Sequence, residues 1–240
     1  MTITSPRPQL AVESPALDAV GVDWYRDIHK GIRNELFALT FRIGNVDPAN
    51  DAALVAVENR VGNLVHLLLG HAEHEDTFCQ PHLEEHVPQF AEIVTRDHAI
   101  LDEEMIGLNA LAAEAADDAR PDDRRRAVHR LYLGLASFTA AYLGHQAFEE
   151  VEVMPALSAV MGQDTLAAVE GAIIASIPPE EMAVALPLML PAMNIDDRYE
   201  TLAGMRLGAP PEVFAGVCGM AAAVLQPEDY RALADRLGIA

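Results

Sequence analysis

Four long segments in the first two thirds of the chain carry apolar residues at alternating spacings of three and four. This spacing keeps the apolar side chains on one face of an α-helix, as in helices that pack into bundles. Short connections between such helices predict an all-α fold, an antiparallel up-down-up-down four-helix bundle. The predicted helices run from about Pro15 or Val22 to Ile43, from an Asp47-Pro48 cap to Pro81, from about Pro88 to a turn at Arg120-Pro121-Asp122, and from there to Pro155. Gly44-Asn45 supplies the stop after the first helix.

The pattern changes after Pro155, where prolines and glycines divide the chain into shorter apolar segments. Asp164 is a candidate cap for a helix reaching Ile177, which Pro178-Pro179 ends. Three or four short helices follow, with breaks at Pro187 and Pro191 and expected starts at Asn194, Pro211 and Pro227. We therefore expect a bundle domain, residues 1–160, and an extension of short helices, residues 161–240. The extension is apolar enough to pack on the bundle or on a second subunit, and a homodimer is one expected outcome.

Polar side chains interrupt the apolar stripes of all four long helices. An unpaired carboxylate or imidazole buried in a helix interface is costly, so this many buried polar groups need a common partner. A bound cation is such a partner. The residues concerned are His29, His71, Glu75, His98, His145 and Glu149.

The histidines are expected at one level of the bundle. His71 and His145 lie late in their helices and His98 lies early, and in an antiparallel bundle these positions are level. His29 lies in the first half of its helix. Carboxylates follow three histidines by four residues, one helical turn, so that both groups can reach the same ion or two adjacent ions. The pairs are His71 with Glu75, His98 with Asp102, and His145 with Glu149.

Imidazole and carboxylate donors without a thiolate favour iron or manganese over zinc. Seven or so donor groups are too many for one ion. Glu75 together with one of Glu149 or Glu150 could bridge two ions, and helical phase alone favours Glu149.

Four segments resemble the successive motifs of the hemerythrin-like (HHE cation-binding) family: "DIHKGIRNEL", "HAEHEDTFCQPHLEEH", "DHAILDEEM" and "HQAFEEVEVMPAL". The resemblance covers about residues 22–157. It implies two non-haem iron ions with oxo or hydroxo and carboxylate bridges. The ligand positions that it implies are His29, His71, Glu75, His98, Asp102, His145 and Glu149 or Glu150.

Asp102 departs from the oxygen-carrying members of the family, which have a second histidine at this position. An additional anionic ligand favours Fe(III) and disfavours reversible oxygen carriage, although Glu103 or water could take this place instead. The resemblance implies that the centre binds and reacts with O2, peroxide or NO, and it leaves open whether the chain is an enzyme. The alternatives are a di-iron oxidase or oxygenase of a small organic substrate, and an oxygen, NO or iron sensor that works through the extension.

The remaining polar residues have simpler interpretations. His74 is expected at the surface or beside the ligands, and Cys79 is expected to be a small buried apolar residue. Tyr25 and Tyr142 are expected to pack in the core with satisfied hydroxyls. The histidines expected to face solvent are His66, His82, His86 and His129.

The charge of the chain narrows the choice of partners. There are 37 acidic and 16 basic residues, a net charge of −21. Such a surface repels nucleic acid and anionic lipid headgroups, so neither nucleic acid nor a membrane is an expected partner. Two cysteines give no disulfide framework, and residues 1–20 lack the apolar run of a signal peptide, which leaves a cytoplasmic location as the expectation.

Overall fold

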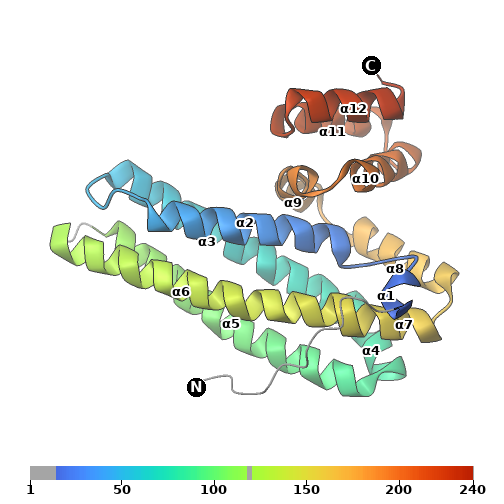
Figure 1. Ribbon diagram of the computed structural model, residues 1–240, viewed down its shortest axis with the longest axis horizontal. Coiled ribbons are helices and arrows are strands. Elements are labelled where there is room, and N and C mark those ends of the chain that lie inside the picture. The colour runs from blue at the N-terminus through green and yellow to red at the C-terminus, as the bar shows by residue number, and fades with distance from the viewer. Residues whose placement is uncertain (1–14, 118–120, 240) are drawn as a thin grey trace. The chain divides into compact units, whose positions relative to one another are not determined.

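The computed structural model describes residues 15–117 and 121–239, and all regular secondary structure in these ranges is helical (Figure 1). The predicted all-α fold is confirmed. The α-helices are α1 (Pro15–Asp18), α2 (Arg26–Gly44), α3 (Asp51–His74), α4 (Gln80–His86), α5 (Pro88–Ala116), α6 (Pro121–Phe148), α7 (Met154–Val160), α8 (Gln163–Ser176), α9 (Pro179–Ala192), α10 (Ile195–Gly208), α11 (Pro211–Val224) and α12 (Pro227–Leu237). Two π-helical turns are η1 (Glu75–Cys79) and η2 (Glu149–Val153).

The described residues form two compact units that share helix α2. The first unit contains residues 15–25 and 36–176, and the second contains residues 26–35 and 177–239. Helix α8, which the sequence assigned to the extension, packs in the first unit, where Leu166 is buried and its carbonyl accepts a hydrogen bond from Trp24 Nε1 at 3.0 Å. The domain division at residue 160 stays a prediction.

Helix α5 is the centre of the first unit, because it packs against both α3 and α6. Its buried residues follow the predicted spacing of three and four. Arg130 of α6 pairs with Glu114 near the end of α5, while His145 near the end of α6 faces His98 near the start of α5. The two helices are therefore antiparallel.

Proline does not end the second and fourth long helices, and this part of the prediction is wrong. After α3 and after α6 the chain makes one π turn and continues as α4 and α7, whose first turns contain Pro81 and Pro155. In each π turn a backbone N–H bonds five residues back, from Gln80 to Glu75 and from Met154 to Glu149. A proline in a regular helix would clash with the carbonyl four residues earlier, and the wider turn relieves this clash.

Several helix boundaries match the prediction and others do not. Helix α5 begins at Pro88 as predicted, and α2 ends at Gly44, one residue beyond the predicted Ile43. The cap of α3 is Asn50, whose side chain accepts from Ala53 N, whereas the Asp47 side chain accepts from Ala49 N in the preceding turn. The first helix is interrupted between α1 and Arg26, and Arg120 of the predicted turn lies outside the described residues.

The second unit has its own apolar core, in which α9, α10, α11 and α12 take part. Asn194, Pro211 and Pro227 begin helices as predicted. Pro187 and Pro191 were expected to break the chain, but both lie inside α9. Burial of Leu186 and Leu190 holds this helix together, and Ala183, whose carbonyl loses its partner at Pro187, is exposed to water.

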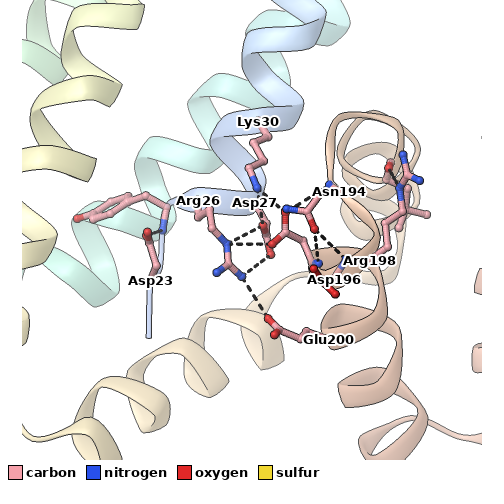
Figure 2. A network of polar contacts seen from close by, with 11 residues as sticks. Asp23, Arg26, Asp27, Lys30, Asn194, Asp196, Arg198 and Glu200 are labelled. Carbon is pink, nitrogen blue, oxygen red and sulfur yellow. Dashed lines mark hydrogen bonds and ion pairs between the residues drawn. The ribbon is translucent and has the colours of Figure 1, made fainter. Parts of the chain in front are cut away.

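A charged network joins α10 to the first turns of α2 within the second unit (Figure 2). Asn194 and Asp197 form a capping box at the start of α10. Asp197, nearly buried, pairs with Lys30 and lies 3.7 Å from Arg26 Nε. Burial would raise the pKa of Asp197, but the hydrogen bond and charge of Lys30, with Arg26 and Asn194, lower it below its ordinary value.

The helical run Asp51–His86 is long and apolar enough to cross a membrane by length and composition. The core helix of a soluble protein satisfies the same criterion, and this run buries Leu54, Val61 and Leu68. The expectation that a membrane is not a partner therefore stays a prediction.

We predict that Asp197→Asn lowers the free energy of unfolding at pH 7 by about 1–3 kcal/mol, since it removes a charge-assisted hydrogen bond to Lys30. Because the folded-state pKa of Asp197 is lowered, its contribution is present above about pH 4 and is lost as the pH falls further. Urea unfolding at pH 7 and pH 3 should show a difference between wild type and variant that shrinks at pH 3. Asp196→Asn, at an exposed neighbouring position, is the control, and equal effects of both variants would contradict the prediction.

Candidate metal centre

Two carboxylates and two imidazoles converge in the first unit. Each of Glu75, His98, His145 and Glu149 offers one ligand atom, and these atoms all lie within 4.8 Å of one another. All four residues are buried. They come from η1, α5, α6 and η2, so the antiparallel pairing of the helices brings them to one level as the sequence predicts.

Glu75 faces a different histidine with each of its carboxylate oxygens. Oε1 lies 3.1 Å from Nε2 of His71, one turn earlier on the same helical run. Oε2 lies 3.4 Å from Nε2 of His98 on α5. Glu75 is therefore placed between two imidazoles of different helices.

Glu149 likewise lies close to two imidazoles, those of His145 and His98. Its Oε1 lies 3.3 Å from Nε2 of His145 and 4.0 Å from Nε2 of His98. The rings of His98 and His145 meet edge to face with centroids 4.9 Å apart. The Glu149 side chain is only 1% exposed, whereas Glu150 is half-buried. Glu149 is thus the more buried of the two candidates, and its role as the ligand stays a prediction.

The two π turns repeat one sequence pattern around the site. A histidine is followed by a glutamate four residues later, then by a proline six residues after the glutamate and a buried leucine two residues after the proline. Each glutamate is the first residue of its π turn, and π turns interrupt helices preferentially at functional positions. The two copies are His71, Glu75, Pro81, Leu83 and His145, Glu149, Pro155, Leu157.

The outward nitrogens of His98 and His145 face further carboxylates. Asp76 Oδ1 lies 2.9 Å from Nδ1 of His98, and Asp97 Oδ2 lies 4.0 Å from Nδ1 of His145. If the Nδ1–H group of His98 donates a hydrogen bond to Asp76, loss of the Nε2 proton would leave a lone pair at Nε2 that a metal ion could accept. Sequence reasoning missed Asp76, because a 56% exposed side chain beside Glu75 has the pattern of a solvated surface residue.

The carboxylates control the protonation of their neighbours. Burial lowers the pKa of His98, but Glu75 and Asp76 raise it more, to about 9. In the metal-free chain His98 is therefore a cation at neutral pH and partly compensates the buried carboxylates. A bound metal ion would take over this role and release the proton.

Two tyrosines and a cysteine line the same region in neutral form. Burial, and then the charges of Glu75 and Glu149, raise the pKa of the Cys79 thiol and of the Tyr142 hydroxyl. Burial, followed by the charges of Cys79 and both glutamates, raises the pKa of Tyr25, whose hydroxyl is hydrogen-bonded to Cys79. Cys79 is buried, as the sequence predicted.

The remaining predicted ligands have different positions. Asp102 is half-buried one turn after His98, and its Oδ1 is buried without a hydrogen-bond partner among the described residues. Glu103 is exposed. His29 is fully buried on α2 but belongs to the second unit, so its approach to the other ligands stays a prediction.

The other histidines mostly follow the sequence analysis. His66 and His129 are exposed as predicted. His74 is half-buried beside the ligands, and its Nδ1 lies 2.6 Å from the Gly70 carbonyl. His82 and His86 are only partly exposed and stack on each other.

Comparison of the sequence with known protein families identifies the family of the chain. The family model of the hemerythrin HHE cation-binding domain matches residues 20–159, more than half of the chain. The chain belongs to this family. No curated protein and no solved structure gives a significant match. The matched range contains every residue of the buried cluster, so the hemerythrin domain and the cluster coincide.

We predict that Glu149→Gln lowers metal affinity by more than about 100-fold, because the amide keeps the size of the side chain and removes the charge of a buried ligand group. Glu150→Gln, at the half-buried neighbouring position, should retain most of the bound metal. Competition with a coloured chelator measures both affinities. A larger loss of metal affinity in Glu150→Gln than in Glu149→Gln would show that Glu150 is the ligand.

We predict that Asp76→Asn lowers metal affinity by about 10–100-fold without unfolding the chain, because the carboxylate orients the His98 ring and increases its basicity. Glu73→Gln, an exposed acidic residue on the same helical run, is the control for a general loss of negative charge. Chelator competition and circular dichroism measure the two effects. An affinity equal to that of Glu73→Gln would show that Asp76 has no orienting role.

Proposed function

We propose that the hemerythrin domain holds two non-haem iron ions and that this centre binds and reacts with O2, peroxide or NO. Membership of a cation-binding family and a buried cluster of histidines and glutamates support metal binding. The proposed ligands are His29, His71, Glu75, His98, Asp102, His145 and Glu149, with Glu150 as the alternative to Glu149. In this proposal α2, α3, α5 and α6 form the antiparallel four-helix bundle of the family.

The position of Glu75 is the observation that carries the proposal of two ions. Its two oxygens face His71 and His98 separately, at 3.1 Å and 3.4 Å. A carboxylate in this position can bridge one ion on the His71 side and another on the side of His98 and His145. A single ion between Glu75 and His98 would leave His71 without a role.

The imidazole and carboxylate groups of the cluster are ligands that suit iron. Imidazole nitrogen and carboxylate oxygen suit iron and manganese, and Cys79 is not among the residues whose ligand atoms converge in the buried cluster. The buried Oδ1 of Asp102 fits an additional anionic ligand. Such a ligand stabilises Fe(III), which favours redox chemistry over reversible oxygen carriage.

When bound, the iron pair would supply electrons and open coordination positions for a small diatomic or peroxide ligand. The contribution of the chain is to exclude water from one side of the centre and to hold protons near it. Buried Cys79, Leu83 and Val94 belong to the apolar cluster that adjoins Glu75 and His98 along the chain. The neutral hydroxyls of Tyr25 and Tyr142 lie within the electrostatic reach of both glutamates.

Metal analysis of protein produced in iron-supplied cells tests this proposal. We expect about two iron ions per chain and an oxo-bridge absorption band in the near ultraviolet. His71→Ala with Glu75→Ala should abolish both and lower the melting temperature, whereas His66→Ala, an exposed histidine of the same helix, should retain them. Zinc alone, no metal, or unchanged iron in the double variant would overturn the assignment.

Three assays on the iron-loaded protein then distinguish peroxide decomposition, oxygen carriage and oxidase or oxygenase activity. Release of O2 from hydrogen peroxide without an organic substrate would identify peroxide decomposition. An absorption band that appears with O2 and disappears under argon would identify a carrier. Consumption of O2 only with a reductant and an organic substrate would identify an oxidase or oxygenase.

A further inference from the structure

A second group of metal-binding side chains lies on α4, outside the buried cluster. His82, Glu85 and His86 each offer one ligand atom, and these atoms lie within 4.8 Å of one another. They occupy the first, fourth and fifth positions of a five-residue stretch, a spacing that places all three on one face of a helix. No residue of this group belongs to the buried centre.

The two imidazoles are arranged as a chelating pair. Their rings are parallel within 2° with centroids 6.3 Å apart. The ring of Trp24 lies beside that of His82, with centroids 6.1 Å apart. Glu85 Oε2 lies 3.9 Å from Nε2 of His86, so a carboxylate oxygen is close to the pair. Between the histidines, Leu83 is buried in the apolar cluster of the first unit and fixes the face that α4 turns to solvent.

The neighbouring acidic side chain is already engaged, which leaves Glu85 as the carboxylate of this group. Glu84 Oε1 accepts a hydrogen bond from Gln80 Nε2 at 3.3 Å. Glu85 has a 70% exposed side chain that can turn toward an ion with little rearrangement. The large negative charge of the chain also favours the approach of cations to such a surface position.

The repeated pattern shows that the fold does not require these three side chains. Helix α7 follows its π turn as α4 does, with Pro155 and Leu157 in the places of Pro81 and Leu83. In this alignment the residues of α7 that correspond to His82, Glu85 and His86 are Ala156, Ala159 and Val160. Small apolar residues are thus sufficient to build this helix, and its packing does not explain the three polar residues of α4.

We propose that His82 and His86, with Glu85 as third ligand, bind one divalent first-row transition-metal ion at the surface of α4. Two imidazoles and one carboxylate suit Zn²⁺, Ni²⁺ and Cu²⁺, with Cu²⁺ bound most tightly. Because both histidines are partly exposed, water fills the remaining coordination positions. The site is independent of the buried iron centre and would exist even if that centre held another metal.

Titration of the full chain with Ni²⁺, followed by calorimetry and equilibrium dialysis, tests this site. Wild type should bind one equivalent more than His82→Ala with His86→Ala, a double variant that places alanine where α7 has small residues. Glu85→Gln should weaken this equivalent without abolishing it. The matched control is His66→Ala with His129→Ala, which removes two exposed histidines and should retain the wild-type stoichiometry.

Two further readouts make the result decisive. With Cu²⁺ added to iron-loaded protein, in which the buried histidines are occupied, the electron paramagnetic resonance spectrum of wild type should show coupling to imidazole nitrogen that the His82/His86 double variant lacks. The iron content of that variant should equal that of wild type. Equal Ni²⁺ binding by the two double variants would overturn the proposal. Loss of iron from the His82/His86 variant would also overturn it, because the histidines would then serve the buried centre.

Discussion

The burial of two carboxylates among apolar helices is the constraint on which the first unit depends. Glu75 and Glu149 are almost removed from water, and a buried negative charge is stable only beside compensating groups. His98 provides this compensation, since it lies between both glutamates and its pKa is raised to about 9. The negative charge of Glu75 and Glu149 can therefore be compensated either by a proton on His98 or by a metal ion bound at the centre.

The π turns allow each of two short segments, residues 75–83 and 149–157, to contribute both a candidate ligand and a buried apolar side chain. A π turn inserts an additional residue, so side chains on its two sides follow different helical phases. Glu75 and Glu149 stand where each turn begins, and Leu83 and Leu157 return to the apolar cluster after it. The prolines stabilise this arrangement because a regular α-helix cannot accommodate them at these positions.

Periodicity was sufficient to predict the long helices and the level at which four of the candidate ligands meet, whereas the choice between Glu149 and Glu150 as ligand stays a prediction. These features depend on residues three or four apart, and local spacing determines which face they share. The continuation past Pro81, the prolines inside α9 and the role of Asp76 could not be predicted. Each depends on contacts with distant segments: burial of Leu83 and Leu190 overrides the helix-breaking tendency of proline, and Asp76 gains its partner only when α5 packs beside η1.

The second unit fixes the start of α2, the helix that carries His29. The first turns of α2 are held in the second unit, where Lys30 pairs with Asp197 and Gly31 lies against Met189 so closely that a Cβ at position 31 would stand 3.1 Å from the Met189 Cα. His29, a proposed metal ligand, precedes both residues in the same turn. Contacts that immobilise Lys30 and Gly31 also restrict His29, because it is adjacent to them in the helix. A side chain contributes most to metal affinity when its orientation is fixed. The charged pair between Lys30 and Asp197 therefore contributes to the fixed position of His29 within the second unit.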